Sequence, residues 1–269
     1  MNLMNFDHIS YRDLKHNQLI TALSDNVQKR LWHHLELVHL PLGTVIYESG
    51  DDLHNAYFPT DAIISLLYVM EDGASAEIAV VGHEGVLGTA LFMGGLSTPN
   101  RAVVQSGGYA YRISAAKFKE EFALHTEMMT LLLLYTQALI TQMTQTAVCN
   151  RHHCVDQQLC RWILLSIDRL PTNHLVMTQE LIANMLGVRR ESVTDAAGKL
   201  QSLSIIEYHR GHIKVLDRAK LEQRACECYA VVKQETDRLL PKYNSLKSSY
   251  IERSHIERSH HEKNAACSN

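Results

Sequence analysis

The spacing of apolar residues changes along the chain, and each change predicts a different kind of secondary structure. Between residues 23 and 37 the apolar positions recur at helical spacing, which predicts a short amphipathic helix with Ser24 as candidate N-cap. Between residues 38 and 113 lie short runs such as TVIYE, IISLLYVM, AEIAVV and RAVVQ, separated by Gly, Asp, Asn and Pro. Short strands with such corners are typical of a roll or sandwich.

A long helix is predicted from about residue 121 to residue 149. Its apolar positions alternate by four and three residues, and such a stripe can form a seam with a partner helix. Packing within the same chain is the alternative. The stripe consists of Leu124, Met128, Leu131, Tyr135 and Ala138.

Three further helices are predicted before the chain turns to strands again. The first spans residues 155–170 and ends before Pro171. The next two fall within residues 179–203, with Thr178 as candidate N-cap and Gly187 as a left-handed turn between them. The residues expected to be buried in this pair are Leu181, Ile182, Met185 and Leu186, then Val193, Ala196, Leu200 and Leu203.

The outward face of the second helix is short and polar, which suits a DNA major groove. It carries Arg190, Glu191, Thr194, Gly198 and Gln201. The segment that follows, IIEYHRGHIKVLD (residues 205–217), alternates apolar and polar residues around an Arg-Gly pair. This pattern predicts a two-stranded hairpin, or wing, beside the helix pair.

Two segments resemble the bacterial Crp/Fnr transcription regulators, relatives of the cyclic-AMP receptor protein and the fumarate-nitrate regulator. They are TQELIANMLGVRRESVTDAAGKLQSLSII (residues 178–206) and LPLGTVIYESGDDLHNAYFP (residues 40–59), and the resemblance covers about residues 20 to 217. It implies an α+β fold with an N-terminal cyclic-nucleotide-binding-like β-roll (jelly roll), a long dimerisation helix and a C-terminal winged helix-turn-helix. It also implies a homodimer on palindromic double-stranded DNA, with RNA polymerase as a candidate partner.

The expected domains are an N-terminal extension (1–21), a β-roll sensor domain (22–120), the dimerisation helix (121–149), the DNA-binding domain (150–217) and a tail (218–269). The tail is predicted to be helical at first, with an end or kink at Pro241. Beyond it, the duplication IERSHIERSH (residues 251–260) has a period that matches neither helix nor strand. We expect no regular structure there.

The resemblance assigns DNA-reading roles by matching position. Arg190 and Glu191 match an Arg-Glu pair that reads a guanine and the opposed cytosine, which their hydrogen-bonding groups suit. Thr194 and Asp195 are expected to adjust the preference, since Asp195 replaces a second base-reading Arg of the family. Arg189 replaces a capping Ser or Thr, so the target site should differ from the best-known family consensus. Candidate contacts to the DNA backbone are Thr178, Arg189, Lys199, Arg210, His212 and Lys214.

The family's nucleotide-binding members use Gly and Glu for the ribose and Arg-Ser or Arg-Thr for the cyclic phosphate. Here Gly88 matches the glycine, but Thr89 stands at the Glu position and Ala102 follows Arg101. Each missing group is worth on the order of 1 to 3 kcal/mol in a buried site. We therefore expect an altered or absent ligand in this effector pocket rather than a tightly bound cyclic nucleotide.

Composition bears on the number of domains, the mode of nucleic-acid binding and the cellular compartment. With 269 residues, 46% of them hydrophobic, the chain has room for two domains with separate cores. A net charge of -3 argues against charge-driven coating of nucleic acid but not against groove reading. There is no signal-peptide pattern, the most apolar stretch (128–134) is too short to span a bilayer, and six scattered Cys fit a reducing cytoplasm, where we expect the protein.

The densest group of soft ligands is Cys149, Cys154 and Cys160 with His152 and His153. Their spacing matches no standard zinc or iron-sulfur pattern, so a redox or metal switch there is a secondary hypothesis. The favoured interpretation packs Cys160 inside and turns the histidines toward water or DNA. No metal and no cofactor are predicted.

Cys226 and Cys228 are two residues apart on a predicted helix. They should therefore face different ways and chelate poorly. The motif GHEG (residues 82–85) is expected to be a solvated turn, because no nucleophile elbow, Walker loop or HExxH accompanies it. No enzyme is expected. The alternative to a transcription regulator is a small-molecule or redox sensor that acts mainly through a protein partner.

Overall fold

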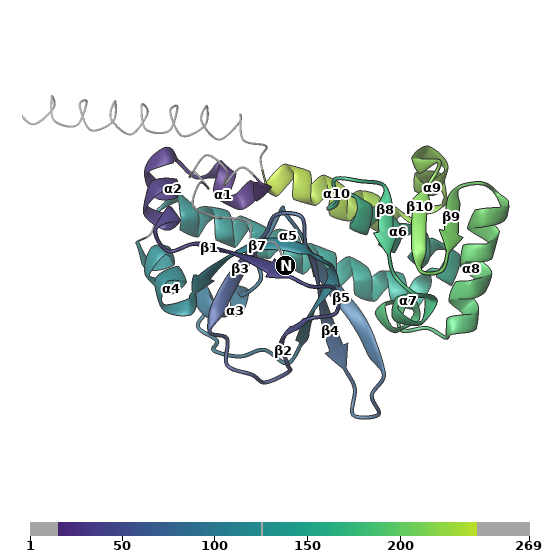
Figure 1. Cartoon of the computed structure of the whole chain (residues 1–269), viewed down its shortest axis with the longest axis horizontal. Coiled ribbons are helices and arrows are strands. Elements are labelled where there is room, and N and C mark those ends of the chain that lie inside the picture. Colours follow the sequence, from purple (N-terminus) through teal and green to yellow (C-terminus); the bar gives the residue numbers. More distant parts are fainter. Residues whose placement is uncertain (1–15, 125, 241–269) are drawn as a thin grey trace, which may run out of the picture.

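The computed structural model describes residues 16–124 and 126–240. Two domains lie side by side along one long helix (Figure 1). The duplication at residues 251–260, Pro241 and most of the predicted N-terminal extension lie outside the described residues.

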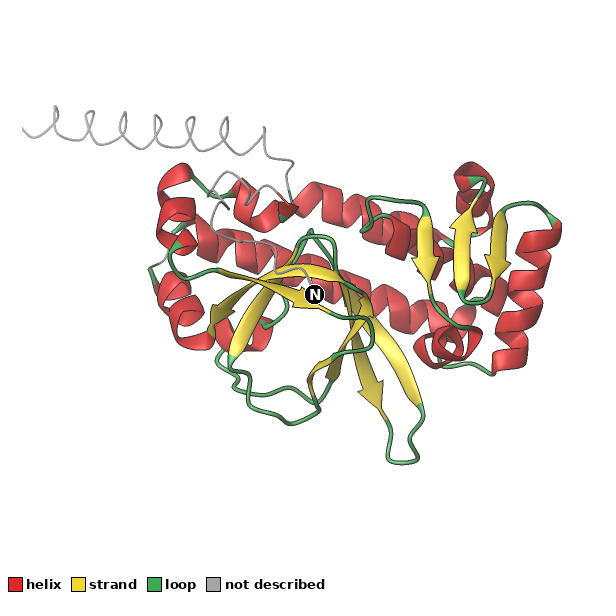
Figure 2. Cartoon of the chain, in the orientation of Figure 1, coloured by secondary structure: helices red, strands yellow, loops and turns green. Residues whose placement is uncertain are grey.

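The N-terminal domain is a roll of antiparallel strands in two sheets (Figure 2). One sheet has the order β1-β7-β3 and the other the order β2-β6-β4-β5. The four predicted runs coincide with β2, β4, β5 and β6, so the expected roll is confirmed. The strands are β1 (Glu36–Leu40), β2 (Val45–Tyr47), β3 (Asn55–Pro59), β4 (Ile63–Val69), β5 (Ser75–Val81), β6 (Arg101–Ser106) and β7 (Gly108–Ser114).

Short helices close the roll. They are α1 (Gln18–Ala22), α2 (Asp25–Trp32), α3 (Thr89–Phe92) and α4 (Ala115–Ala123). The helix predicted for residues 23–37 was too long: α2 ends at Trp32, and residues 36–40 pair with β7, which satisfies their backbone groups. Ser24 is the N-cap of α2 by position, but its side chain makes no cap hydrogen bond.

The sequence pattern missed α1 altogether. Its N-cap Asn17 is fully buried, and its side chain accepts hydrogen bonds from the backbone of Leu19 and Ile20. The same side chain donates to the carbonyl oxygens of Pro59 and Gly85, both at 2.9 Å. A buried amide with all these partners pins α1 to the roll.

The long helix predicted from residue 121 is two helices. α4 ends at Ala123, with Leu124 as its C-cap, and α5 (Glu127–His152) begins as a separate helix with Thr126 as its N-cap. Buried Glu121 in α4 accepts a hydrogen bond at Oε1 from Nε of Arg30 at 2.7 Å. Glu127 in α5 accepts one from the backbone N of Ser24, also at 2.7 Å. Both carboxylates are thus held by α2 and its N-cap, one from each helix.

The apolar stripe predicted to meet a partner helix faces the protein's own core instead, which is the intramolecular alternative. Met128, Leu131, Tyr135 and Ala138 are buried in the core of the roll, whereas Leu124 is 50% exposed. The fit is close at Gly85, where an added Cβ would come within 2.4 Å of the Tyr135 ring.

The C-terminal domain packs helices against a small sheet with the strand order β8-β10-β9. Its elements are α6 (Val155–Ile167), β8 (His174–Val176), α7 (Gln179–Leu186), α8 (Arg190–Ser202), β9 (Ile206–His209), β10 (His212–Val215) and α9 (Arg218–Arg224). The predicted hairpin is β9-β10, to which β8 adds a third strand that the sequence pattern did not indicate. A last helix, α10 (Glu227–Leu239), returns along α5 toward the roll (Figure 1).

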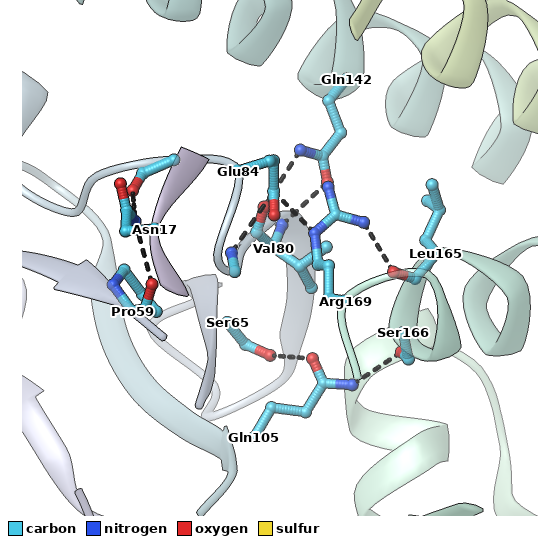
Figure 3. A network of polar contacts seen from close by, with 12 residues as sticks. Asn17, Pro59, Ser65, Val80, Glu84, Gln105, Gln142, Leu165, Ser166 and Arg169 are labelled. Atoms are coloured by element: carbon cyan, nitrogen blue, oxygen red, sulfur yellow. Dashed lines mark hydrogen bonds and ion pairs between the residues drawn. The ribbon is translucent and has the colours of Figure 1, made fainter. Parts of the chain in front are cut away.

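A buried polar network joins the two domains (Figure 3). Arg169, just after α6, donates from Nε to Oε1 of Glu84 at 2.7 Å, and both side chains are at most 10% exposed. Gln142 of α5 exchanges two hydrogen bonds with the backbone of Val80 in β5. The prediction that residues 82–85 form a solvated turn is therefore wrong, because Glu84 is a buried ion-pair partner of the other domain.

A second series of hydrogen bonds links the roll to the C-terminal domain. Ser65 Oγ lies within hydrogen-bonding distance of Oε2 of Glu77 and of Oε1 of Gln105, although one hydroxyl proton can serve only one acceptor. A protonated Glu77 satisfies all of them: it donates to Ser65, which donates to Gln105. Gln105 Nε2 then donates to Oγ of Ser166 in α6 at 2.9 Å. Burial raises the pKa of Glu77 to about 7, against the opposing effect of Arg161 and Arg169.

Replacing Glu77 by Gln should remove a pH dependence of stability. The folded-state pKa of about 7 lies above the ordinary 4.5, so folding takes up a proton, and the free energy of unfolding falls as pH rises between these values. Gln keeps an N–H donor toward Ser65 and does not titrate. Chemical unfolding from about pH 5 to about pH 8 should show a decline of up to about 3 kcal/mol in the wild type and a flatter profile in Glu77→Gln. Glu71→Gln, at an exposed position in the turn between β4 and β5, is the control, and an unchanged decline in Glu77→Gln would contradict the assignment.

Candidate nucleic-acid interface

The turn between α7 and α8 forms as the sequence predicts. Thr178 caps α7, accepting from the backbone N of Leu181 at 3.3 Å. Gly187 ends the helix at φ 65°, in the left-handed region, where glycine carries no Cβ penalty. Ile182, Met185 and Leu186 are buried as expected, along with Ala183, but the prediction for Leu181 is wrong because it is 41% exposed.

The second helix buries one face and exposes the other. Val193, Ala196 and Leu200 are buried, as predicted. Leu203 was expected inside but is 47% exposed, because α8 has ended at Ser202 and the chain turns away.

A groove of about 610 Å³ runs between the start of α7, the exposed face of α8 and the wing. Gly198 opens its floor, since a Cβ added there would meet nothing within 4 Å. The groove is lined by Thr178, Gln179, Glu180, Arg190, Thr194, Ala197, Gly198, Gln201, Tyr208, Arg210 and Gly211.

The four predicted base-reading residues are all exposed on α8. Arg190 pairs loosely with Glu180, with Nε and Oε2 at 4.0 Å and both side chains more than 60% exposed. Thr194 lies with its hydroxyl 2.9 Å from Oε1 of Gln179, so it is already engaged within the protein. Of the four, Arg190 and Thr194 line the groove, whereas Glu191 and Asp195 are exposed outside its lining.

The residues predicted to contact the DNA backbone lie in different places. Thr178 and Arg210 line the groove. Arg189 is the N-cap of α8 but makes no side-chain cap hydrogen bond, so the helix begins without the usual side-chain acceptor. Lys199 is directed to Asp156 of α6, with Nζ and Oδ2 at 3.2 Å.

The other two predicted contacts to the DNA backbone, His212 and Lys214, lie on the wing. Arg210 and Gly211 both have positive φ, 48° and 83°, as a tight two-residue hairpin turn requires. His212 stacks on His174, with ring nitrogens 3.2 Å apart, and Lys214 lies opposite Glu207 in the strand register. Both lie outside the groove lining.

Tyr208 is a groove residue that the sequence analysis missed. Its hydroxyl donates to the carbonyl oxygen of Met177 at 2.9 Å, and burial raises its pKa to about 12. The signal was available: Tyr208 alternates with exposed Glu207 and His209 along β9 and pairs with buried Ile213.

In the roll, the predicted effector residues lie on different elements. Gly88 has φ 113° and starts α3 at Thr89, and an added Cβ would press on Ala56 at 3.3 Å. Arg101 in β6 pairs with Glu48, with Nε and Oε2 at 3.1 Å. Ala102 is fully buried beside it.

Of the soft-ligand group in the secondary hypothesis, the structure brings together Cys149 and His153. His153 is 14% exposed and lies beside Cys228, so the prediction that both histidines face water or DNA is wrong for this residue. Cys154 is exposed, Cys160 is buried in the core of the C-terminal domain as predicted, and Cys149 belongs to a different cluster.

Cys149 meets Cys226 and Cys228, which the sequence analysis expected to face apart. The predicted helix there is broken at residues 225–226, so Cys226 stands at the N-cap position of α10 and its thiol lies close to that of Cys228.

None of the helices in the described part of the chain combines the length and apolarity needed to cross a membrane.

Sequence comparison agrees with this architecture. A profile of the Crp-like helix-turn-helix domain matches residues 157–224, and one of the cyclic nucleotide-binding domain matches residues 37–125. The matches fall on the C-terminal domain and on the roll. The chain belongs to the Crp/Fnr family. It is accordingly a DNA-binding transcription regulator and not an enzyme. A search of curated protein sequences found no significant match.

Solved structures share the fold. A Crp/Fnr-family regulator from Eubacterium rectale is 18% identical and aligns over 78% of this chain and 98% of its own, with a TM-score of 0.58. FixK2 from Bradyrhizobium japonicum is 15% identical over 71% and 98%, with a TM-score of 0.60. CLP from Xanthomonas campestris, described as responsive to c-di-GMP, is 16% identical over 71% and 99%, with a TM-score of 0.56.

We predict weak or absent binding of cyclic AMP to the roll. Thr89 supplies no carboxylate for the ribose and Ala102 no hydroxyl for the phosphate, each worth on the order of 1 to 3 kcal/mol. Isothermal titration should detect no saturable binding to the wild type, and tighter binding to the Thr89→Glu, Ala102→Ser double variant. Wild-type binding as tight as that of the double variant would contradict the prediction.

Proposed function

We propose that the protein is a homodimeric regulator that binds a palindromic operator, with one α8 in the major groove of each half-site. The observation that carries the proposal is the exposed polar face of α8 beside an open groove and a wing. In helix-turn-helix proteins an exposed recognition helix places its N-terminal residues in the major groove.

Arg190 and Glu191 are the proposed base readers. The guanidinium of Arg190 can donate to O6 and N7 of guanine, and the carboxylate of Glu191 can accept from N4 of cytosine. The ion pair of Arg190 with Glu180 is long and exposed, so it costs little to exchange for a base. Thr194 and Asp195 adjust the preference, and Asp195 disfavours an acceptor-rich guanine edge.

Contacts to the DNA backbone would surround these base-reading residues. The N-terminus of α8 has no side-chain cap, so its amide groups and Arg189 are available to a phosphate. Arg210 at the wing turn borders the groove on its other side. Lys199 is held by Asp156 in an exposed pair worth at most about 1 kcal/mol, which a phosphate could replace.

A second copy would pack on α5. Apart from the faces covered by the roll and by α10, this helix exposes a stripe in which intervals of three and four residues alternate. That spacing is typical of a seam between two helices. Leu133 and Ile140, 50% and 55% exposed, are its large apolar members. The stripe consists of Thr130, Leu133, Gln137, Ile140, Thr144 and Ala147.

Selection of bound sequences from a random DNA pool tests the proposal as a whole. A palindromic site with half-sites about one helical turn apart is the expected result. A nonpalindromic site would count against the dimer, and no specific site under any effector would favour a sensor that acts through a protein partner. The cytoplasm, where the DNA is, is the setting in which we expect the protein to act.

Arg190→Ala should reduce discrimination at one guanine per half-site by roughly 1 to 3 kcal/mol. Binding to random DNA should change much less, because the substitution removes hydrogen bonds to a base edge. Gel-shift affinities for the selected site, its guanine variants and random DNA measure both quantities. Equal weakening on all sequences would remove Arg190 from the base-reading role.

Lys214→Ala is the matched comparison for that measurement. Its side chain lies on the wing and is proposed to contact a phosphate, so binding should weaken uniformly across sequences. The salt dependence of log K should become shallower by about one unit of slope for each phosphate that the lysine no longer neutralises. An unchanged slope would exclude the contact.

Ile140→Asp should yield a monomer, because it places a charge in the proposed seam. Light scattering after size exclusion measures the mass, and affinity for the palindrome should fall by about 10² or more because the second half-site is no longer linked to the first. Val231→Asp, at an exposed apolar position of α10, is the control and should stay dimeric. A dimeric Ile140→Asp protein would show that the seam lies elsewhere.

A further inference from the structure

Four potential metal ligands meet where α5 ends and α10 begins. They are Cys149 in the last turns of α5, His153 at its C-cap, Cys226 at the N-cap of α10 and Cys228 in its first turn. One ligand atom from each lies within 4.8 Å of all the others. The three cysteines are at most 4% exposed.

Two of the ligand–ligand distances are close to those of a tetrahedral site. Zn–S bonds of about 2.3 Å and Zn–N bonds of about 2.0 Å place two sulfurs about 3.8 Å apart, and a sulfur and a nitrogen about 3.5 Å apart. The Sγ atoms of Cys149 and Cys226 are 3.5 Å apart, and Sγ of Cys228 is 3.6 Å from Nδ1 of His153.

The histidine is oriented as a ligand. Its Nδ1 faces Sγ of Cys228, and its Nε2 lies 3.3 Å from Oε2 of Glu227. A carboxylate behind a metal-binding imidazole fixes the tautomer and makes the ring nitrogen a stronger ligand. Gln158 Nε2 donates to the carbonyl oxygen of His153 at 2.8 Å, which steadies the C-cap that carries the ring.

Nearby charge suits a metal-thiolate centre. Three thiolates and a neutral imidazole around a divalent ion leave one net negative charge. Arg161 is buried, donates from Nη1 to Thr146 at 3.2 Å, and interacts electrostatically with Cys149 and Cys228. Its Nε has no hydrogen-bond partner among the described residues.

Buried cysteines often serve only as small apolar residues. That role would explain Cys160, which packs among the leucines and isoleucines of the C-terminal core. It does not explain an imidazole nitrogen that lies 3.6 Å from one of three clustered thiols, with a carboxylate at the other ring nitrogen.

We propose that Cys149, His153, Cys226 and Cys228 form a Cys3His site for a thiophilic divalent ion of the Zn²⁺ class. Binding releases the three thiol protons to solvent and forms three metal–sulfur bonds and one metal–nitrogen bond, without any change of oxidation state. All four positions are filled by protein, which makes the site structural rather than catalytic.

The site would link the start of α10 to the junction between α5 and α6. His153 lies between α5, which carries the proposed dimer seam, and α6, which leads into the DNA-binding domain. α10 packs along α5 on its way back to the roll. An occupied site would therefore hold three helices at the point where the two domains join.

Cobalt substitution of the full chain tests the proposal. The reduced protein is stripped with a chelator and titrated first with Co²⁺ and then with Zn²⁺. We expect one Co²⁺ per chain, with the strong visible bands of tetrahedral cobalt and thiolate-to-cobalt charge transfer, and stoichiometric displacement by Zn²⁺. Weak octahedral bands, or no binding, would overturn the proposal.

The variants locate the ion. Cys149→Ser and Cys228→Ser should lose the charge-transfer bands, whereas exposed Cys154→Ser, buried Cys160→Ser and Cys267→Ser should keep them. Glu227→Gln, 75% exposed and unable to destabilise the core, should weaken Co²⁺ binding about 10-fold or more with the same spectrum. Unchanged bands in Cys228→Ser would overturn the site.

A mass measurement under nonreducing conditions separates the redox explanation. A disulfide between Cys149 and Cys226, in a protein whose reduced form binds no Co²⁺, would replace the metal site by a redox pair. The discrimination measured for Arg190→Ala has no bearing on these results, so the two proposals fail independently.

Discussion

The buried polar joint between the roll and the DNA-binding domain sets the geometry of the rest of the molecule. Polar groups taken out of water must find partners, so the ion pair of Glu84 with Arg169 and the chain from Glu77 to Ser166 allow few relative placements of the two domains. The groove beside α8 inherits its orientation from this joint.

α5 serves three surfaces at once. One face fills the core of the roll, a second receives α10, and a third exposes Leu133 and Ile140. The apolar residues of α5 are not confined to one side because two of its faces pack within the chain. The third face is still available to a second copy. The proposed Cys3His site lies at its C-terminal end, where the chain passes into the DNA-binding domain.

Much of the fold was predictable because it rests on local rules. Alternation located β2, β4, β5 and β6, and a capping Thr, a left-handed Gly and helical spacing located α7 and α8. The errors came where long-range contacts prevail over local pattern. Arg30 and Ser24 hold carboxylates of the separate helices α4 and α5, and pairing with β7 turns residues 36–40 into a strand.

The sequence by itself determined the two-domain plan, the helix-turn-helix and the residues on its outward face, because periodicity and capping act over a few residues. Only the tertiary structure decided which stripe of α5 is buried, that Glu84 is an ion-pair partner, and that Cys149 lies beside Cys226 and Cys228. The reason is physical. Residues 77 positions apart in the chain, such as Cys149 and Cys226, meet only after the helices that carry them have packed.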